Sequence, residues 1–156
     1  MQATFGLISL GCAKNQVDSE IMTGVMEEAG FVYAEPERAQ VLIINTCGFI
    51  DPAKQEAIDT IFSAVRAREN GEAPAEQKIL VAGCLSQRYA SELAVSMPEA
   101  DCFIGVDKIG EVAEIAAACL KGTAERIYTT KVSRLMPDYG MPRTLISPPH
   151  YAYIKI

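Results

Sequence analysis

Three short apolar runs, each followed by a stretch with helical periodicity, constrain most strongly what this chain can fold into. The runs cover residues 4–10, 41–45 and 78–82 and are apolar almost throughout. Such near-continuous apolar runs are typical of parallel strands that are covered on both faces. After the first run, Val17, Ile21 and Val25 recur every four residues, which predicts an amphipathic helix. The alternation of strand and helix predicts βαβ units and a mostly parallel sheet.

The remaining pattern completes one α/β domain. Residues 31–34 and 101–105 are predicted as two shorter strands, and helices are expected to begin near Asn15, Asp51, Ser86 and Asp107. Asp51, Ser86 and Asp107 are suitable N-cap residues for the last three helices. We therefore expect a flavodoxin-like open parallel sheet of about five strands in the order 2-1-3-4-5, with helices on both faces and right-handed crossovers.

The sequence pattern of alternating strands and helices ends after Gly122. Residues 123–149 contain four prolines and little helical periodicity, and residues 150–156 alternate as a strand does. We therefore expect a domain at 1–122, an extended linker at 123–149 and, at 150–156, the start of a truncated second domain.

Composition narrows the function classes. The chain has 156 residues, is 49% hydrophobic and has a mean hydropathy of +0.12, which indicates a globular protein. The sequence shows neither a membrane span nor a secretory signal, so we expect a cytoplasmic protein without a membrane partner. Its net charge of −6 and its lack of a basic run argue against this domain as the main nucleic-acid contact.

Three cysteines occupy the same position in three βα units. Cys12, Cys47 and Cys84 each follow a predicted buried strand, and each has a glycine as its neighbour. In open parallel sheets, sites form outside the carboxyl ends of the strands, near the point where the strand order reverses. The predicted order places these three strands side by side, about 4.8 Å apart. We therefore predict that the three thiols meet and hold a metal cluster.

The alternative is that these cysteines are small core residues, since free cysteines are among the most buried residue types. Cys102 and Cys119 fit that alternative better, because they lie within a predicted strand and on the stripe of an Ala-rich helix. The odd number of five cysteines in a cytoplasmic chain argues against disulfides.

Three thiolates favour an iron–sulfur cluster over zinc. A structural zinc site needs four ligands, and the only histidine, His150, lies beyond the predicted linker. Iron–sulfur clusters are commonly held by four cysteines, so three ligands would leave one iron open to chemistry. Lys14 and Asn15 could donate hydrogen bonds to cluster sulfurs or face solvent. Asp18, Ser19 and Glu20 are expected in the first turns of the helix, where acidic and capping residues suit its dipole.

At these residues the chain resembles the N-terminal domain of the methylthiotransferases, a radical S-adenosylmethionine family. The resemblance lies in the segments SLGCAKNQVDSE (9–20), NTCGFID (45–51), AGCLSQRY (82–89) and PPHYAYIKI (148–156). One branch of the family modifies an isopentenylated adenosine of transfer RNA. The other methylthiolates an aspartate of a small-subunit ribosomal protein (RimO type). The residues after the first two cysteines, Ala13-Lys14-Asn15 and Gly48-Phe49-Ile50, are similar to the ribosomal-protein branch.

The resemblance implies that Cys12, Cys47 and Cys84 bind an auxiliary 4Fe–4S cluster with one open iron. It also implies a second 4Fe–4S cluster on a CxxxCxxC motif after residue 156, S-adenosylmethionine as cosubstrate, and an electron donor. No such motif occurs in these 156 residues, so we expect this chain alone to be inactive. Two alternatives remain open, which are a transfer-RNA methylthiotransferase domain and a cluster-free flavodoxin-like interaction domain.

Overall fold

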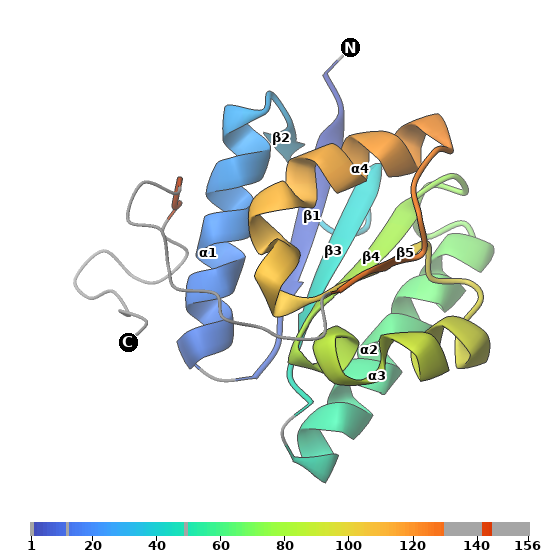
Figure 1. The fold of residues 1–156 in the computed structure, drawn as a ribbon. Helices are drawn as coiled ribbons and strands as arrows, with labels where there is room; N and C mark the ends of the chain where they lie inside the picture. The colour runs from blue at the N-terminus through green and yellow to red at the C-terminus, as the bar shows by residue number, and fades with distance from the viewer. Residues whose placement is uncertain (1, 12, 49, 130–141, 145–156) are drawn as a thin grey trace.

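Among the residues that the structure describes, a parallel sheet of six strands forms the centre (Figure 1). The computed structural model describes residues 2–11, 13–48, 50–129 and 142–144. The strands are β1 (Thr4–Ser9), β2 (Val32–Tyr33), β3 (Val41–Thr46), β4 (Lys78–Gly83), β5 (Cys102–Ile104) and β6 (Ile127–Tyr128). They lie in the order β2-β1-β3-β4-β5-β6, and every pairing is parallel. The predicted flavodoxin-like α/β fold is confirmed, with one strand more than expected.

Helices cover both faces of the sheet. The helices are α1 (Ala13–Glu28), α2 (Asp51–Glu69), α3 (Cys84–Ser96), the 3₁₀ helix η1 (Val106–Glu111) and α4 (Val112–Lys121). Successive side chains of β3 point to opposite faces, so Val41 and Ile43 pack with α1 and α4, whereas Leu42 and Ile44 pack with α2 and α3. This two-sided burial explains why the strands are apolar almost throughout. None of the described helices has both the length and the apolar character needed to cross a lipid bilayer.

The sixth strand lies in the range that we expected to be linker. The backbone N–H groups of Phe103 and Gly105 donate to the carbonyl oxygens of Arg126 and Tyr128, so β6 pairs with the edge of β5. A two-residue strand is too short to show a periodicity, which is why the sequence did not reveal it. The remaining linker residues 130–141 and 145–149, and the segment 150–156, lie outside the described residues.

The three predicted N-caps are wrong. Asp51 is the first residue of α2 and not the residue before it. Helix α3 begins at Cys84, and Ser86 donates its hydroxyl hydrogen to the carbonyl oxygen of Val81 at 2.7 Å. Asp107 lies inside η1. In each case the helix begins at or before the residue that was predicted as its N-cap.

Candidate metal centre

Two of the three predicted ligands lie at neighbouring strand ends. Thr46 and Gly83 are partners in the register of β3 and β4, and Cys47 and Cys84 are the next residues along the chain. Neighbouring strands lie about 4.8 Å apart. Both thiols are half-buried, so they are held by the fold and still open to a ligand. Cys84 is also the first residue of α3, and the N-terminal end of a helix dipole favours negative charge.

The loop after β1 reaches the same place. A Cβ at Gly11 would lie 2.6 Å from the Cβ of Cys47 and 3.4 Å from its Sγ. The chain just before Cys12 is therefore in contact with the second predicted ligand. A Cβ at Gly48 would lie 2.9 Å from the Cα of Leu85, so the β3 loop packs in turn on the start of α3.

Cys12 itself lies outside the described residues. Within the part of the chain that the structure describes, no three His, Cys, Asp or Glu side chains gather as metal ligands. The structure thus brings together Cys47, Cys84 and the residue that precedes Cys12, and the position of the third thiol stays a prediction.

Gly83 sits where no other residue fits well. Its φ is +99°, which side chains rarely adopt. A Cβ there would overlap the carbonyl oxygen of Thr46 and would lie 2.6 Å from Oδ1 of Asn45. The tight turn of Gly83 directs the chain from β4 straight into α3 and so places Cys84 at the edge of the sheet.

Asn15 ties the first two loops together. Its side-chain amide is buried and donates to the carbonyl oxygens of Leu10 at 2.9 Å and Thr46 at 2.7 Å. Those carbonyls lie two residues before Cys12 and one residue before Cys47. The amide hydrogens are therefore used by the loops themselves, which is neither of the two roles, a hydrogen bond to a cluster sulfur or exposure to solvent, that the sequence left open for Asn15. Lys14 is exposed.

Asn45 and Thr46 extend this network beneath the loops. The amide of Asn45 donates to the carbonyl oxygen of Asn15 at 2.7 Å and to Oγ of Ser19 at 2.8 Å. Ser19 in turn donates to Oγ of Ser9 at 2.7 Å, and Thr46 donates to the carbonyl oxygen of Ala82 at 2.6 Å. Strands β1, β3 and β4 and helix α1 are thereby joined by buried hydrogen bonds just below the cysteines.

Asp18, Ser19 and Glu20 do not serve the dipole of α1. The helix begins at Ala13, so these residues lie in its second turn, and all three are buried. The dipole interpretation is therefore wrong. Ser19 belongs to the polar network below the cysteines, and Glu20 forms an ion pair with Arg143.

Cys102 and Cys119 are core residues, as expected. They are 0% and 4% exposed, and their sulfur atoms lie 2.7 Å apart. The hydrogen bond between the thiols raises the pKa of Cys102 and lowers the pKa of Cys119. Cys102 pairs with Leu80, three residues before the end of β4, so this pair lies below the edge that carries Cys47 and Cys84.

One contact beside the site was not foreseen from sequence. Nζ of Lys54 on α2 lies 3.0 Å from the hydroxyl of Tyr89 on α3 and 4.8 Å from the centre of its ring. This hydrogen bond raises the pKa of Lys54. Tyr89 has non-helical backbone angles and interrupts α3. Tyr89 falls in one of the motifs quoted above, whereas nothing in the sequence singles out Lys54.

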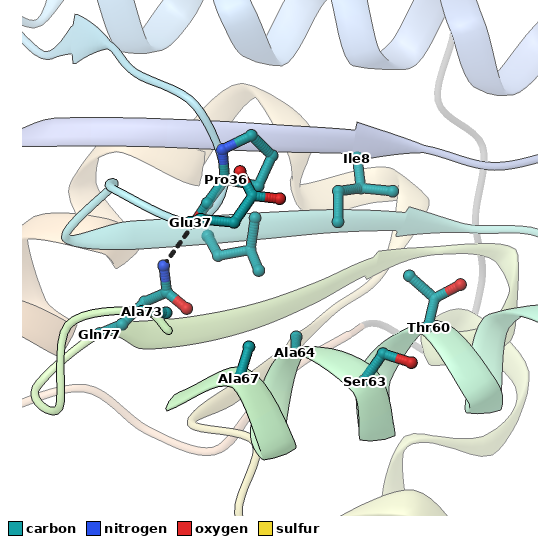
Figure 2. A pocket seen from close by; sticks show the side chains of 10 residues that line it. Ile8, Pro36, Glu37, Thr60, Ser63, Ala64, Ala67, Ala73 and Gln77 are labelled. Atoms are coloured by element: carbon teal, nitrogen blue, oxygen red, sulfur yellow. Dashed lines mark hydrogen bonds between the residues drawn. The ribbon is translucent and has the colours of Figure 1, made fainter. Parts of the chain in front are cut away.

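A small cavity lies elsewhere, between α2 and the sheet (Figure 2). Its volume is about 150 Å³, and its lining includes Ile8, Leu42, Ala64 and Ala67. Ligand pockets usually measure about 300–1,000 Å³, and none of the four cysteines that the structure describes lines this cavity. It is therefore a packing gap under the loop that carries Pro36, and not part of the metal centre.

A known protein family has a sequence model that matches this chain. The family described as "Uncharacterized protein family UPF0004" matches residues 4–105, which include all three predicted ligands and the whole edge described above. The chain belongs to this family.

Several curated relatives of this chain carry the same protein name. Proteins named "Ribosomal protein uS12 methylthiotransferase RimO" are 53% identical over 100% of the chain in Akkermansia muciniphila and 47% identical over 96% in Heliobacterium modesticaldum. A third, from Pelotomaculum thermopropionicum, is 44% identical over 100% of the chain. The chain spans about a third of the length of these relatives. The resemblance to an N-terminal methylthiotransferase domain of the RimO type is confirmed.

Proposed function

We propose that this chain is the cluster-holding domain of an enzyme that methylthiolates the β-carbon of an aspartate in a small-subunit ribosomal protein. The observation that supports the proposal is the edge of the sheet, where Thr46 and Gly83 are partners in the register of β3 and β4 and each is followed directly by a cysteine. The names of the relatives support the reaction and the class of substrate.

The donor set at this edge suits an iron–sulfur cluster. Cys47 and Cys84 are half-buried thiols, and Gly11 leaves the first loop room to lie against Cys47. Thiolates are soft ligands that select iron–sulfur clusters or zinc. Cys12, Cys47 and Cys84 would hold a 4Fe–4S cluster. When bound, such a cluster supplies an iron with one open position, which can carry the sulfur to be transferred.

The protein's own residues act by holding the thiols at a fixed edge. Asn15 fixes the loops after β1 and β3 to each other, and Gly83 fixes the start of α3. The ligands are thus carried by the ends of central strands, which are among the most rigid parts of a fold. A rigid edge would hold the three thiols in one fixed arrangement.

The complete enzyme needs parts that this chain does not contain. We expect a second 4Fe–4S cluster on a CxxxCxxC motif, S-adenosylmethionine as cosubstrate, an electron donor that reduces the clusters, and a cytoplasmic location. None of the 156 residues forms that motif, and we therefore expect this chain alone to be inactive.

Anaerobic reconstitution with iron and sulfide tests the cluster. We expect a brown protein with about four irons per chain. Replacing Cys12, Cys47 or Cys84 by Ala removes the iron, because three ligands become two. A wild-type chain that stays colourless and iron-free would favour the alternative of a cluster-free interaction domain.

Cys102→Ala and Cys119→Ala are the matched controls. Each removes one thiol from the chain but none from the edge of the sheet, so iron content should equal that of wild type. An equal loss of iron in these controls would mean that the thiols act through folding and not as ligands.

The substrate is tested with the complete enzyme. It is offered the small-subunit ribosomal protein and transfer RNA side by side, and each product is analysed by mass spectrometry. We expect a methylthio group on the aspartate of the protein. A methylthio group found on the RNA alone would assign the enzyme to the transfer-RNA branch.

A further inference from the structure

A short segment far along the chain lies against helix α1. Residues 142–144, coloured in Figure 1, are described beside α1 although more than 110 residues separate them from it in sequence. Nε of Arg143 donates to Oε2 of Glu20 at 2.6 Å, and Nη2 lies 2.5 Å from the same oxygen. Thr144 adds two hydrogen bonds, from its backbone N–H to the carbonyl oxygen of Glu20 at 2.9 Å and from its hydroxyl to Oε2 of Glu27 at 2.6 Å.

The ion pair is unusual because the carboxylate is fully buried. The Glu20 side chain is 0% exposed, whereas that of Arg143 is 28% exposed. A buried charge is costly unless it is paired and hydrogen-bonded. The guanidinium supplies two N–H donors to one oxygen, which is a strong form of this contact. Glu20 is thus adapted to receive a cation from the segment that crosses it.

Gly24 shows independently that α1 is shaped for this segment. A Cβ at Gly24 would lie 2.6 Å from the backbone nitrogen of Arg143 and 2.7 Å from the carbonyl carbon of Pro142. Glycine inside a helix destabilises it relative to alanine. Here the missing side chain lets the backbone of the segment lie directly on the helix.

We propose that Glu20, Gly24 and Glu27 form an anchoring site for residues 142–144, and that this anchor sets where the chain enters the next domain. The second part rests on the proposed function, in which that domain begins near His150. An extended chain spans at most about 3.3–3.6 Å per residue. From Tyr128 the chain could therefore reach about 75 Å to His150. From an anchored Thr144 it reaches only about 20 Å.

The anchor confines the second domain to the neighbourhood of α1. The anchoring residues Glu20 to Glu27 lie 8 to 15 residues along α1 from the first predicted ligand, or about 12–22 Å. A connection confined there keeps the second domain within reach of the cluster edge and raises its effective concentration at that edge. The arrangement requires no bound metal, so it can be tested on the 156-residue chain.

Amide hydrogen exchange at Thr144 tests the anchor. In the wild-type chain we expect its N–H to exchange at least about tenfold more slowly than in an unstructured peptide. Glu20→Gln and Gly24→Ala should each speed that exchange about fivefold or more. Glu28→Gln is the matched control for Glu20→Gln, since this exposed carboxylate lies on the same helix.

Gly24→Ala separates release of the segment from unfolding, because alanine favours the helix while its methyl group displaces residues 142–144. Two results would overturn the anchor. One is a Thr144 N–H that exchanges in wild type as fast as in an unstructured peptide, and the other is an exchange rate that neither variant changes.

The second part is tested in the complete enzyme with Gly24→Ala. We expect unchanged iron content and at least about threefold less methylthio product per S-adenosylmethionine cleaved, as expected for a lost positioning contact. An unchanged ratio would overturn the positioning role. The exchange measurement needs neither iron nor substrate, so failure of the proposed function would leave its result intact.

Discussion

At the scale of single residues, Gly83 explains how the third predicted ligand reaches the edge of the sheet. Strand β4 ends and helix α3 begins without an intervening loop. Such an abrupt change of direction requires a backbone conformation that side chains rarely adopt, and Gly83 has a φ of +99°. The sequence shows a glycine beside each of the three cysteines, but only the structure shows that this one is required by both conformation and space.

Gly83→Ala should destabilise the fold by about 3 kcal/mol, which combines backbone strain and overpacking. Gly71→Ala is the control, because Gly71 also has a positive φ of +80° but no atom lies within 4 Å of the added Cβ. It should cost only about 1–2 kcal/mol, the left-handed strain alone. Urea unfolding of both variants measures the difference. Equal costs would show that the crowding at Thr46 and Asn45 relaxes freely.

At the scale of elements, the cysteine-bearing loops act as one unit because of Asn15. The buried amide of Asn15 donates to the carbonyl oxygens of Leu10, just after β1, and of Thr46, at the end of β3. The amide of Asn45 in β3 in turn donates to the carbonyl oxygen of Asn15 in α1. Removal of this amide leaves one buried and one partly buried carbonyl oxygen without its donor. Each buried unpaired group costs about 1–3 kcal/mol.

Asn15→Asp has nearly the same shape and loses both N–H donors. We expect it to lower the free energy of unfolding by at least about 3 kcal/mol, because two hydrogen bonds are lost and a carboxylate is buried against carbonyl oxygens. Gln55→Glu makes the same chemical change at an exposed amide that donates to Asp59 at 2.8 Å, and it should cost no more than about 0.5 kcal/mol. Thermal unfolding at neutral pH compares the two. A small effect at both positions would mean that the loops hold together without the amide.

Regular elements were predictable from sequence, and their ends were not. The strands and helices follow from apolar periodicity, and the side-by-side placement of β1, β3 and β4 follows from the rules of parallel sheets. Helix starts depend on backbone turns such as that at Gly83, and the positions of capping residues in the sequence did not predict them. Strand β6 and the contact of Arg143 with Glu20 could not be predicted, because each depends on a tertiary partner and not on a local pattern.

At the scale of the whole molecule, the two pairs of helices bury the sheet on both faces, and the predicted metal centre lies at its carboxyl edge. The cysteines divide in the same way. Cys47 and Cys84 are half-buried at the edge, whereas Cys102 and Cys119 are enclosed between β5 and α4. Labelling of the edge cysteines should therefore measure access to the edge, and labelling of the buried pair should measure opening of the whole domain.

Thiol labelling of the reduced, iron-free chain tests this division. Cys47 should react with a disulfide reagent in the native state, while Cys102 and Cys119 should react only when the domain unfolds. With an unfolding free energy of at least about 5 kcal/mol, the buried pair should react at least about a thousandfold more slowly.

Mass spectrometry of digested samples assigns each modified cysteine, and full denaturation provides the control in which all thiols react. Added urea should accelerate labelling of the buried pair with the same slope as global unfolding.

The contact with Cys102 lowers the pKa of Cys119, and a thiolate is the reactive form. A lower pKa raises the reactive thiolate fraction of Cys119, so slow labelling of this thiol would indicate its burial. Labelling of Cys119 as fast as that of Cys47 would mean that α4 opens locally, independently of the edge that carries the predicted cluster.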